Sequence, residues 1–229
     1  KFDKIDNKII ELILKKRLQG KPLSKIIKQK GFWKNIFITT DDTLDPRADS
    51  EIIIENILKD LSTSNIDKFN FIDLCCGTGC LGISILYELQ NSYCDFIDIS
   101  EKAISVCKKN ILKMQVQNRS NTFLSNLFSN YSTKKLHQAN FLICNPPYIP
   151  SKYYLKLDNE TLHDPRIALD GGQEGTFFYF EILNFLLKIK FNGDIYFEID
   201  PIISIKLEKF LLEKRLKIVY KKMDYLNLD

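Results

Sequence analysis

The chain lacks the features of a membrane or exported protein. Its 229 residues contain no apolar stretch of eighteen, the length that a membrane-spanning helix needs. An apolar run at 177–187 is interrupted by Glu181 and Asn184, which is typical of a core helix. No signal peptide is visible either. We therefore expect no association with a membrane.

Histidine is scarce, and the cysteines are poorly spaced for metal or disulfide sites. The two histidines, His137 and His163, lie far in sequence from the cysteine cluster at 75–80. The six cysteines include no Cys-x-x-Cys pair, and adjacent Cys75 and Cys76 have poor disulfide geometry. This argues against a zinc site and excludes a Ser-His-Asp or Cys-His-Asp triad. We expect a reduced, cytoplasmic protein without a bound metal.

Neither sign of charge dominates. Lys and Arg number 33 against 29 Asp and Glu, which gives a formal net charge of +4. Such a mild excess does not predict direct binding to nucleic acid. Hydrophobic residues make up 45% of the chain and charged residues 27%, as in a globular protein of one or two domains.

From residue 69 onward, apolar strands alternate with helices. Strands are expected at 69–75, 94–99, 121–125, 140–144, 194–199 and 217–222, and helices at 79–89, 101–113, 175–189 and 202–214. This alternation predicts an α/β fold with a doubly wound, mainly parallel sheet. Ahead of it we expect helices at 3–16, 23–29 and 49–61, and a hairpin strand at 35–40. Ligands of such sheets bind beyond the carboxyl ends of the strands.

The strongest motif is Asn-Pro-Pro-Tyr at 145–148, directly after an apolar strand. Consecutive prolines fix φ and lack N–H donors, so no helix forms there, and the preceding asparagine is held extended. The side-chain carbonyl of Asn145 and the backbone carbonyl of Pro146 can then face one point as two acceptors. Two converging acceptors suit a planar –NH2 group, on which Tyr148 would pack. This predicts chemistry on an amide or an exocyclic amine; a structural Pro-Pro turn is the alternative.

A second motif, Asp-Leu-Cys-Cys-Gly-Thr-Gly at 73–79, ends a strand and opens a helix. Its glycines permit a tight turn and close approach of a ligand. Gly77, Gly79 and Gly82 have the spacing of the Gly-x-Gly-x-x-Gly pattern of dinucleotide sites, so the glycines alone do not distinguish a dinucleotide from S-adenosylmethionine. Asp73 can accept from the amino group of S-adenosylmethionine, and Asp98 can accept the ribose hydroxyls. These residues favour S-adenosylmethionine over a nicotinamide; a plain strand-to-helix turn and a capping role for Asp98 are the alternatives.

A third segment, Asn126-Leu127, follows the predicted strand at 121–125. Asn126 could hydrogen-bond the adenine amine, and Leu127 could cover the adenine ring. An ordinary strand end with a core leucine is the alternative interpretation.

Two further segments carry a resemblance. They are Pro-Arg-Ala-Asp-Ser-Glu at 46–51 and Pro-Arg-Ile-Ala-Leu-Asp-Gly-Gly-Gln-Glu-Gly at 165–175. Together with the motifs at 73–79 and 145–148, they resemble the HemK/PrmC family, protein-(glutamine-N(5)) methyltransferases that act on peptide-chain release factors. Asn-Pro-Pro-Tyr alone is shared with amino-methyltransferases of adenine, so these two segments narrow the resemblance.

The resemblance implies a class I S-adenosylmethionine-dependent methyltransferase with a Rossmann-like fold, acting on a class I release factor. It implies a remnant of a helical docking domain at 1–30, a hairpin linker at 31–48 and a catalytic domain at 49–229, with the last strand expected to be missing. The implied catalytic residues are Asn145, Pro146 and Tyr148, joined by Pro147 in binding substrate. The implied cofactor-binding residues are Asp73, Cys75, Cys76, Gly77, Thr78, Gly79, Asp98, Asn126, Leu127 and Asn145.

The chain departs from the family pattern at three places. Cys75 stands where the family has its first glycine, Asn126 stands where Asp is more usual, and His-Asp-Pro at 163–165 replaces an aromatic-Glu-Pro sequence. Cys75 and Asn126 leave open a methyltransferase-fold binding partner without turnover, and the shared Asn-Pro-Pro-Tyr motif leaves open an adenine-amine methyltransferase of DNA or RNA.

Overall fold

The computed structural model describes residues 7–64, 66–219 and 221–222. Its centre is a five-stranded sheet in the order β5-β4-β3-β6-β7, in which every neighbouring pair is parallel. The strands are β3 (Asn70–Leu74), β4 (Tyr93–Asp98), β5 (Ser120–Leu124), β6 (Phe141–Cys144) and β7 (Asp194–Phe197). The predicted α/β fold with a mainly parallel sheet is confirmed.

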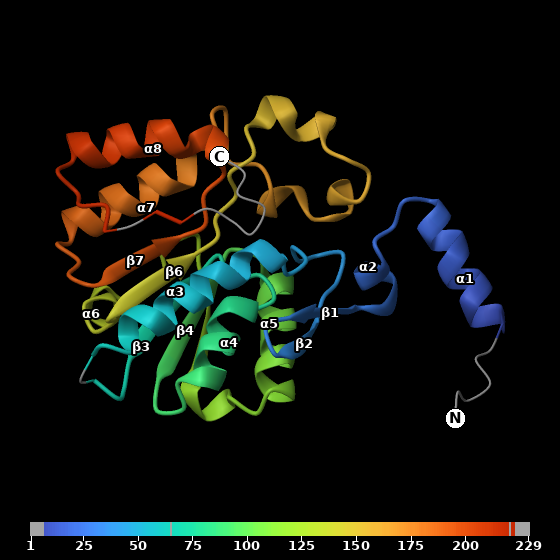
Figure 1. Ribbon diagram of the computed structural model, residues 1–229, viewed down its shortest axis with the longest axis horizontal. Coiled ribbons are helices and arrows are strands. Elements are labelled where there is room, and N and C mark those ends of the chain that lie inside the picture. The colour runs from blue at the N-terminus through green and yellow to red at the C-terminus, as the bar shows by residue number, and fades with distance from the viewer. Residues whose placement is uncertain (1–6, 65, 220, 223–229) are drawn as a thin grey trace.

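Helices cover both faces of this sheet (Figure 1). One face carries α3 (Glu51–Leu61), α4 (Cys80–Glu88) and α5 (Glu101–Lys113); the other carries α6 (Thr133–Leu136) and α7 (Phe177–Lys188), and α8 (Pro201–Glu213) packs on α7. Successive strand residues alternate between the two faces, so Phe71 packs with the first group and Ile72 with the second. Because both faces are buried, the strands are continuous apolar runs in the sequence.

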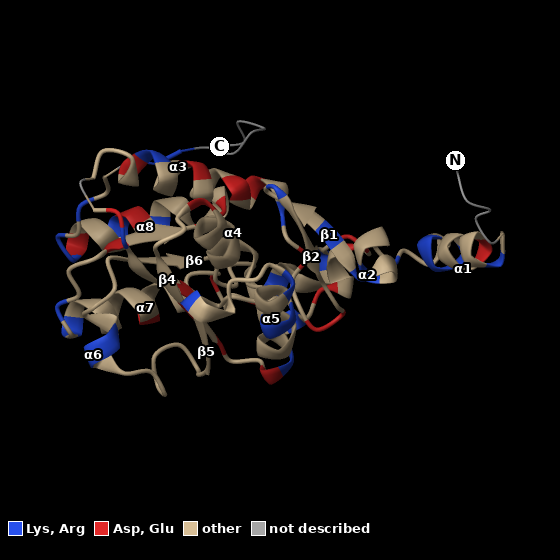
Figure 2. Ribbon diagram, turned by 90° about the horizontal axis from the view of Figure 1, so that it is seen from below, with Lys and Arg blue, Asp and Glu red and all other residues tan. Residues whose placement is uncertain are grey.

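A two-stranded antiparallel hairpin precedes the sheet. It consists of β1 (Gln29–Phe32) and β2 (Asn35–Ile38) and packs on α5. Asn110 of α5 holds it, because its Oδ1 accepts from the Ile38 N–H at 2.7 Å and its Nδ2 donates to the Ile38 carbonyl at 3.0 Å. Farther upstream, α1 (Asn7–Leu18) has no buried residue and extends away from the body in Figure 2.

The N-terminal elements differ in part from those expected. The helix predicted at 23–29 is α2 (Leu23–Ile27), and it ends early because Lys28 adopts a φ of 57°. Gln29 already belongs to β1, which forms the predicted hairpin with β2 but begins before the expected bound at residue 31. Residues 3–6 of the helix expected at 3–16 lie outside the described residues. The proposed domain boundaries stay predictions.

The strand predicted at 217–222 is wrong for the described part of that segment, which adopts no strand. Two of its lysines instead form ion pairs with glutamates of α8 and α3. Lys221 Nζ lies 3.1 Å from Glu208 Oε1 of α8, and Lys222 Nζ lies 3.4 Å from Glu55 Oε2 of α3. These exposed ion pairs place the two lysines beside α8 and α3.

Between β6 and α7 the chain forms short 3-10 helices rather than one long element. They are η3 (Ser151–Lys156), η4 (Thr161–His163) and η5 (Arg166–Ala168); η1 (Ala48–Ser50) and η2 (Gln117–Arg119) lie elsewhere. Among the residues that the structure describes, no helix has both the length and the apolar character needed to span a bilayer. The expected cytoplasmic localisation stays a prediction.

Candidate active site

The carboxyl ends of β3, β4 and β5 meet at Asp98. The Gly77 N–H donates to Asp98 Oδ2 at 2.9 Å, and the Ser100 N–H donates to Oδ1 at 2.8 Å. The Ser125 N–H donates to the Asp98 backbone carbonyl at 2.9 Å. Burial raises the pKa of the Asp98 carboxyl. Asp98 therefore joins the turn after β3 to the segment after β5, as parallel strands require.

The turn after β3 has three residues in the left-handed region. Cys75, Gly77 and Gly79 have φ values of 58°, 52° and 77°. A Cβ on Gly79 would lie 2.7 Å from Cys107 Sγ, so this glycine serves packing, whereas a Cβ on Gly77 would meet nothing within 4 Å. Gly77 therefore offers open space where a ligand can approach the backbone.

Asp73 lies behind this turn. Its side chain is buried, and Oδ2 accepts from the Gly82 N–H of α4 at 2.9 Å. Burial raises the pKa of this carboxyl well above its usual value. Thr78 is also buried, and its carbonyl accepts from Asn110 Nδ2 at 2.9 Å. The predicted contact of Asp73 with a cofactor amino group stays a prediction, because the visible role of Asp73 is to anchor α4.

The cysteines around the turn are free thiols. Burial raises the pKa of Cys76, which contacts Cys107, and that of Cys144, which contacts Cys75. A raised pKa keeps a thiol protonated and unreactive. In the part of the chain that the structure describes, no three His, Cys, Asp or Glu side chains are arranged to hold a metal ion.

Asn126 and Leu127 follow β5 at the same edge of the sheet. Asn126 is exposed, and its carbonyl accepts from the Ser129 N–H at 3.0 Å in a turn. Leu127 adopts a φ of 48° and is half-buried against the core cluster that contains Ile72. Both residues directly follow Ser125, whose N–H donates to the Asp98 carbonyl, while their contact with adenine stays a prediction.

The Asn-Pro-Pro-Tyr motif borders a cavity of about 410 Å³. Pro146 and Pro147 are buried, whereas Asn145 and Tyr148 are partly exposed and line the cavity. The rest of the lining is both apolar and charged: Leu44, Arg47, Asp49, Ile149, Pro150, Tyr153, Leu157, Thr161, Ala168, Leu169, Glu198, Asp200 and Ile202. The cavity is large enough for more than one amide group, as a substrate segment would require.

The segment at 165–175 packs closely against this motif. The Ile149 N–H donates to the Leu169 carbonyl at 2.9 Å, and the Gly171 N–H donates to the Ile149 carbonyl at 2.8 Å. A Cβ on Gly171 would lie 2.7 Å from the Pro147 carbonyl oxygen, and one on Gly175 only 2.2 Å from that of Tyr148. We call these contacts the glycine clamp. Only glycine permits the two backbones to approach so closely.

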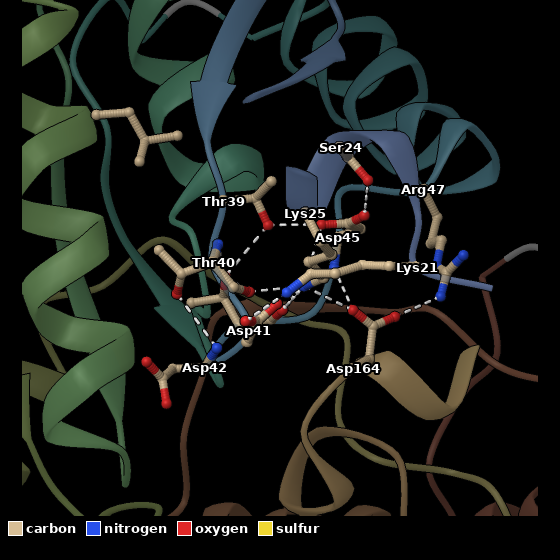
Figure 3. A network of polar contacts seen from close by, with 12 residues as sticks. Lys21, Ser24, Lys25, Thr39, Thr40, Asp41, Asp42, Asp45, Arg47 and Asp164 are labelled. Atoms are coloured by element: carbon tan, nitrogen blue, oxygen red, sulfur yellow. Dashed lines mark hydrogen bonds and ion pairs between the residues drawn. The ribbon is translucent and has the colours of Figure 1, made fainter. Parts of the chain in front are cut away.

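An ionic network with a buried centre includes Arg47, one of the residues that line the cavity (Figure 3). Lys25 Nζ lies 2.8 Å from Asp164 Oδ1 and 3.1 Å from Asp45 Oδ1. Arg47, which lines the cavity, donates to Asp164 Oδ2 at 2.6 Å. Ser24 also donates to Asp45. The network joins α2, the segment after β2 and the end of η4.

The sequence analysis missed two polar residues at Asn145. Ser50 Oγ lies 3.4 Å from Asn145 Nδ2 and donates to Glu198 Oε2. Burial raises the pKa of Glu198, although its hydrogen bonds oppose the shift. A signal was present, because Glu198 falls near the carboxyl end of a predicted strand, as Asp98 and Asn145 do.

Comparison with known proteins finds a family model that covers this site. A profile described as "Methyltransferase small domain" matches residues 39–172, which include both the turn after β3 and the Asn-Pro-Pro-Tyr motif. The chain belongs to the methyltransferase small domain family. This family implies the use of S-adenosylmethionine.

Curated relatives of this family member carry more specific names. The chain is 36% identical over 195 residues to the release factor glutamine methyltransferase of Mycoplasma mycoides, covering 80% of this chain and 67% of that protein. It is 32% identical to the enzyme of that name in Clostridium botulinum, with coverages of 86% and 70%. A bifunctional methyltransferase of Rickettsia prowazekii is 33% identical, but the chain spans only 43% of its length, against 92% of its own.

Solved structures share the fold of this methyltransferase family member. The ribosomal protein L11 methylase of Lactobacillus delbrueckii superposes with a TM-score of 0.55 at 14% identity, over 81% of this chain and 77% of that one. The hMettl16 catalytic domain, solved with an RNA hairpin, gives 0.61 at 12% identity, over 78% and 66%. At these identities the likeness shows the Rossmann-like fold alone.

Proposed function

We propose that this chain transfers a methyl group from S-adenosylmethionine to the side-chain amide nitrogen of a glutamine in a class I peptide-chain release factor. The observation that carries the proposal is the position of Asn145 and Tyr148 beside a cavity of about 410 Å³, with the glycine clamp behind them. The names of the relatives from Mycoplasma and Clostridium support the same substrate.

The site fits the cofactor that the family implies. Gly77 has open space beside its Cα, and Asp98 offers carboxylate oxygens at the strand end. Asn126 is exposed and follows Ser125, whose N–H donates to the Asp98 carbonyl. We propose that Asp98 accepts the ribose hydroxyls, that Asn126 and Leu127 contact the adenine, and that residues 73–79 line the methionine part. When bound, S-adenosylmethionine supplies a methyl group on a positively charged sulfur.

The nitrogen of the acceptor amide is a poor nucleophile, because its lone pair is delocalised. We propose that Asn145 Oδ1 and the Pro146 carbonyl accept hydrogen bonds from the amide –NH2. These fixed acceptors orient the nitrogen and stabilise the positive charge that develops on it. Orientation can contribute about 7–11 kcal/mol to lowering the barrier, and one well-placed hydrogen bond about 3–4 kcal/mol. The methylated nitrogen becomes acidic and releases its proton afterwards, so no general base acts before transfer.

Incubation with radiolabelled S-adenosylmethionine and a class I release factor tests this proposal, followed by mass mapping of the modified residue. We expect one methyl group on a glutamine side chain. A parallel incubation with single-stranded DNA and RNA oligonucleotides addresses the adenine alternative. Label on adenine, with none on the release factor, would overturn the proposal. Binding of the cofactor measured by calorimetry, without label on any substrate, would favour a partner that lacks turnover.

A further inference from the structure

Glu198 follows β7 and is fixed through its backbone. Its N–H donates to the Cys144 carbonyl at 3.2 Å, directly before Asn145 in the sequence. Its carbonyl accepts from the Tyr179 hydroxyl at 2.7 Å, and Tyr179 is wholly buried in α7. These two backbone hydrogen bonds therefore fix Glu198 beside the Asn-Pro-Pro-Tyr motif.

Three hydrogen-bond donors surround the Glu198 carboxylate. Ser50 Oγ donates to Oε2, and the polar side chains of Asn145 and Tyr148 oppose the rise that burial causes in the pKa of this carboxyl. Asn145 Nδ2 further lies 3.4 Å from Ser50 Oγ. An ionised carboxylate is purely an acceptor, so it can satisfy all three donors at once. A neutral amide in its place would bring a donor of its own.

The orientation of Asn145 matters because its side chain has a carbonyl end and an –NH2 end of nearly equal shape. Only the carbonyl end can accept from the –NH2 group of a substrate amide, and a flipped Asn145 would face it with a donor. We propose that Glu198 is a positioning residue that holds Asn145 Nδ2 toward its carboxylate and thereby turns Asn145 Oδ1 toward the acceptor nitrogen. This inference rests on the proposed amide methyl transfer.

A double-mutant cycle tests the inference. Glu198→Gln keeps the shape of the side chain, and we expect it to lower kcat about tenfold or more, because a misplaced acceptor loses orientation. The KM for the release factor and the Kd for S-adenosylmethionine should change by less than about threefold. In an Asn145→Ala background the same change should lower the rate by less than about twofold, because the two residues act as one unit. Equal losses in both backgrounds would overturn the inference. Glu213→Gln, on the exposed end of α8, is the matched control.

A second measurement does not depend on activity. The side-chain –NH2 resonances of Asn145, assigned by their loss in Asn145→Ala, should move in Glu198→Gln and stay in place in Glu213→Gln. If Glu198→Gln does not fold, Ser50→Ala replaces it, because it removes one neighbour of both side chains. Unmoved resonances in the folded variant would overturn the inference. If the wild-type protein methylates no glutamine but these resonances move, the proposed function fails while the role of Glu198 in orienting Asn145 stands.

Discussion

Lys25 Nζ lies 2.8 Å from Asp164 Oδ1, and the two side chains are only 0% and 3% exposed. Lys25 comes from α2 and Asp164 from the end of η4, so one buried ion pair joins the N-terminal segment to a residue that also binds Arg47 of the cavity lining. The same Lys25 donates to the Thr40 carbonyl at 2.7 Å and also to that of Thr43. All of its donors are therefore directed at acceptors, as a buried ammonium requires.

We expect Lys25→Met to lower the free energy of unfolding by about 3–5 kcal/mol, because it leaves buried Asp45 without its cation and Asp164 with Arg47 alone. Urea unfolding followed by circular dichroism measures this. Lys102→Met is the matched control: Lys102 pairs with Asp42 at 2.8 Å but is 74% exposed. An exposed pair contributes about 0–1 kcal/mol. Equal effects of the two substitutions would contradict the assigned importance of the buried pair.

Asn145→Ala is expected to lower the rate of methyl transfer at least about a hundredfold, because it removes one of the two proposed acceptors. Binding of S-adenosylmethionine should be nearly intact. Single-turnover transfer of label to the release factor measures the rate, and calorimetry measures the binding. Asn91→Ala, in an exposed turn, serves as the control. A rate for Asn145→Ala equal to that of wild type would refute its role.

Gly171→Ala should damage the site without any strain from backbone conformation. Its new Cβ would lie 2.7 Å from both the Pro147 carbonyl oxygen and the Tyr148 Cα. Both are backbone atoms, so the Asn-Pro-Pro-Tyr segment must shift, and a displacement of about 1 Å can cost about a hundredfold in rate. Gly31→Ala, whose Cβ would meet nothing within 4 Å, is the control. The two rates, measured by the same assay, should differ; a Gly171→Ala enzyme of normal rate would speak against the clamp.

Asp73→Asn is expected to make the protein more stable at pH 7. Burial raises the pKa of Asp73 in the folded state above the ordinary value of 3.8. The ionised carboxylate therefore costs stability above about pH 3.8, and the cost disappears as the pH falls below that value. The asparagine can still accept from Gly82. A gain of about 1 kcal/mol corresponds to a Tm higher by about 2–4 °C.

Thermal unfolding from pH 3 to pH 8 checks this prediction, with exposed Asp67→Asn as the control. The Tm advantage of Asp73→Asn over wild type should shrink toward zero at the acid end. An advantage that grows as the pH falls would have the wrong sign. If Asp73 also binds the cofactor amino group, the same variant should bind S-adenosylmethionine more weakly.

Much of this arrangement could be predicted from the sequence, because it depends on local patterns. The apolar run before Asn145 and the glycine-rich turn after Asp73 each identify a strand end, and a parallel sheet brings such ends to one edge. Glu198 and Ser50 were missed because their contact with Asn145 joins segments far apart in the chain. The left-handed φ of Cys75 was not foreseen either, because glycine and not cysteine is the residue that adopts this conformation at little cost.

The glycine clamp has a consequence for tracing the ancestry of such enzymes. Because Gly171 and Gly175 sit directly against the carbonyls of Pro147 and Tyr148, neither segment can change its backbone alone. Substitutions in the segment at 145–148 should therefore be accompanied by substitutions in the segment at 165–175. A sequence search that requires both segments should separate enzymes with this clamp from enzymes that carry Asn-Pro-Pro-Tyr without it.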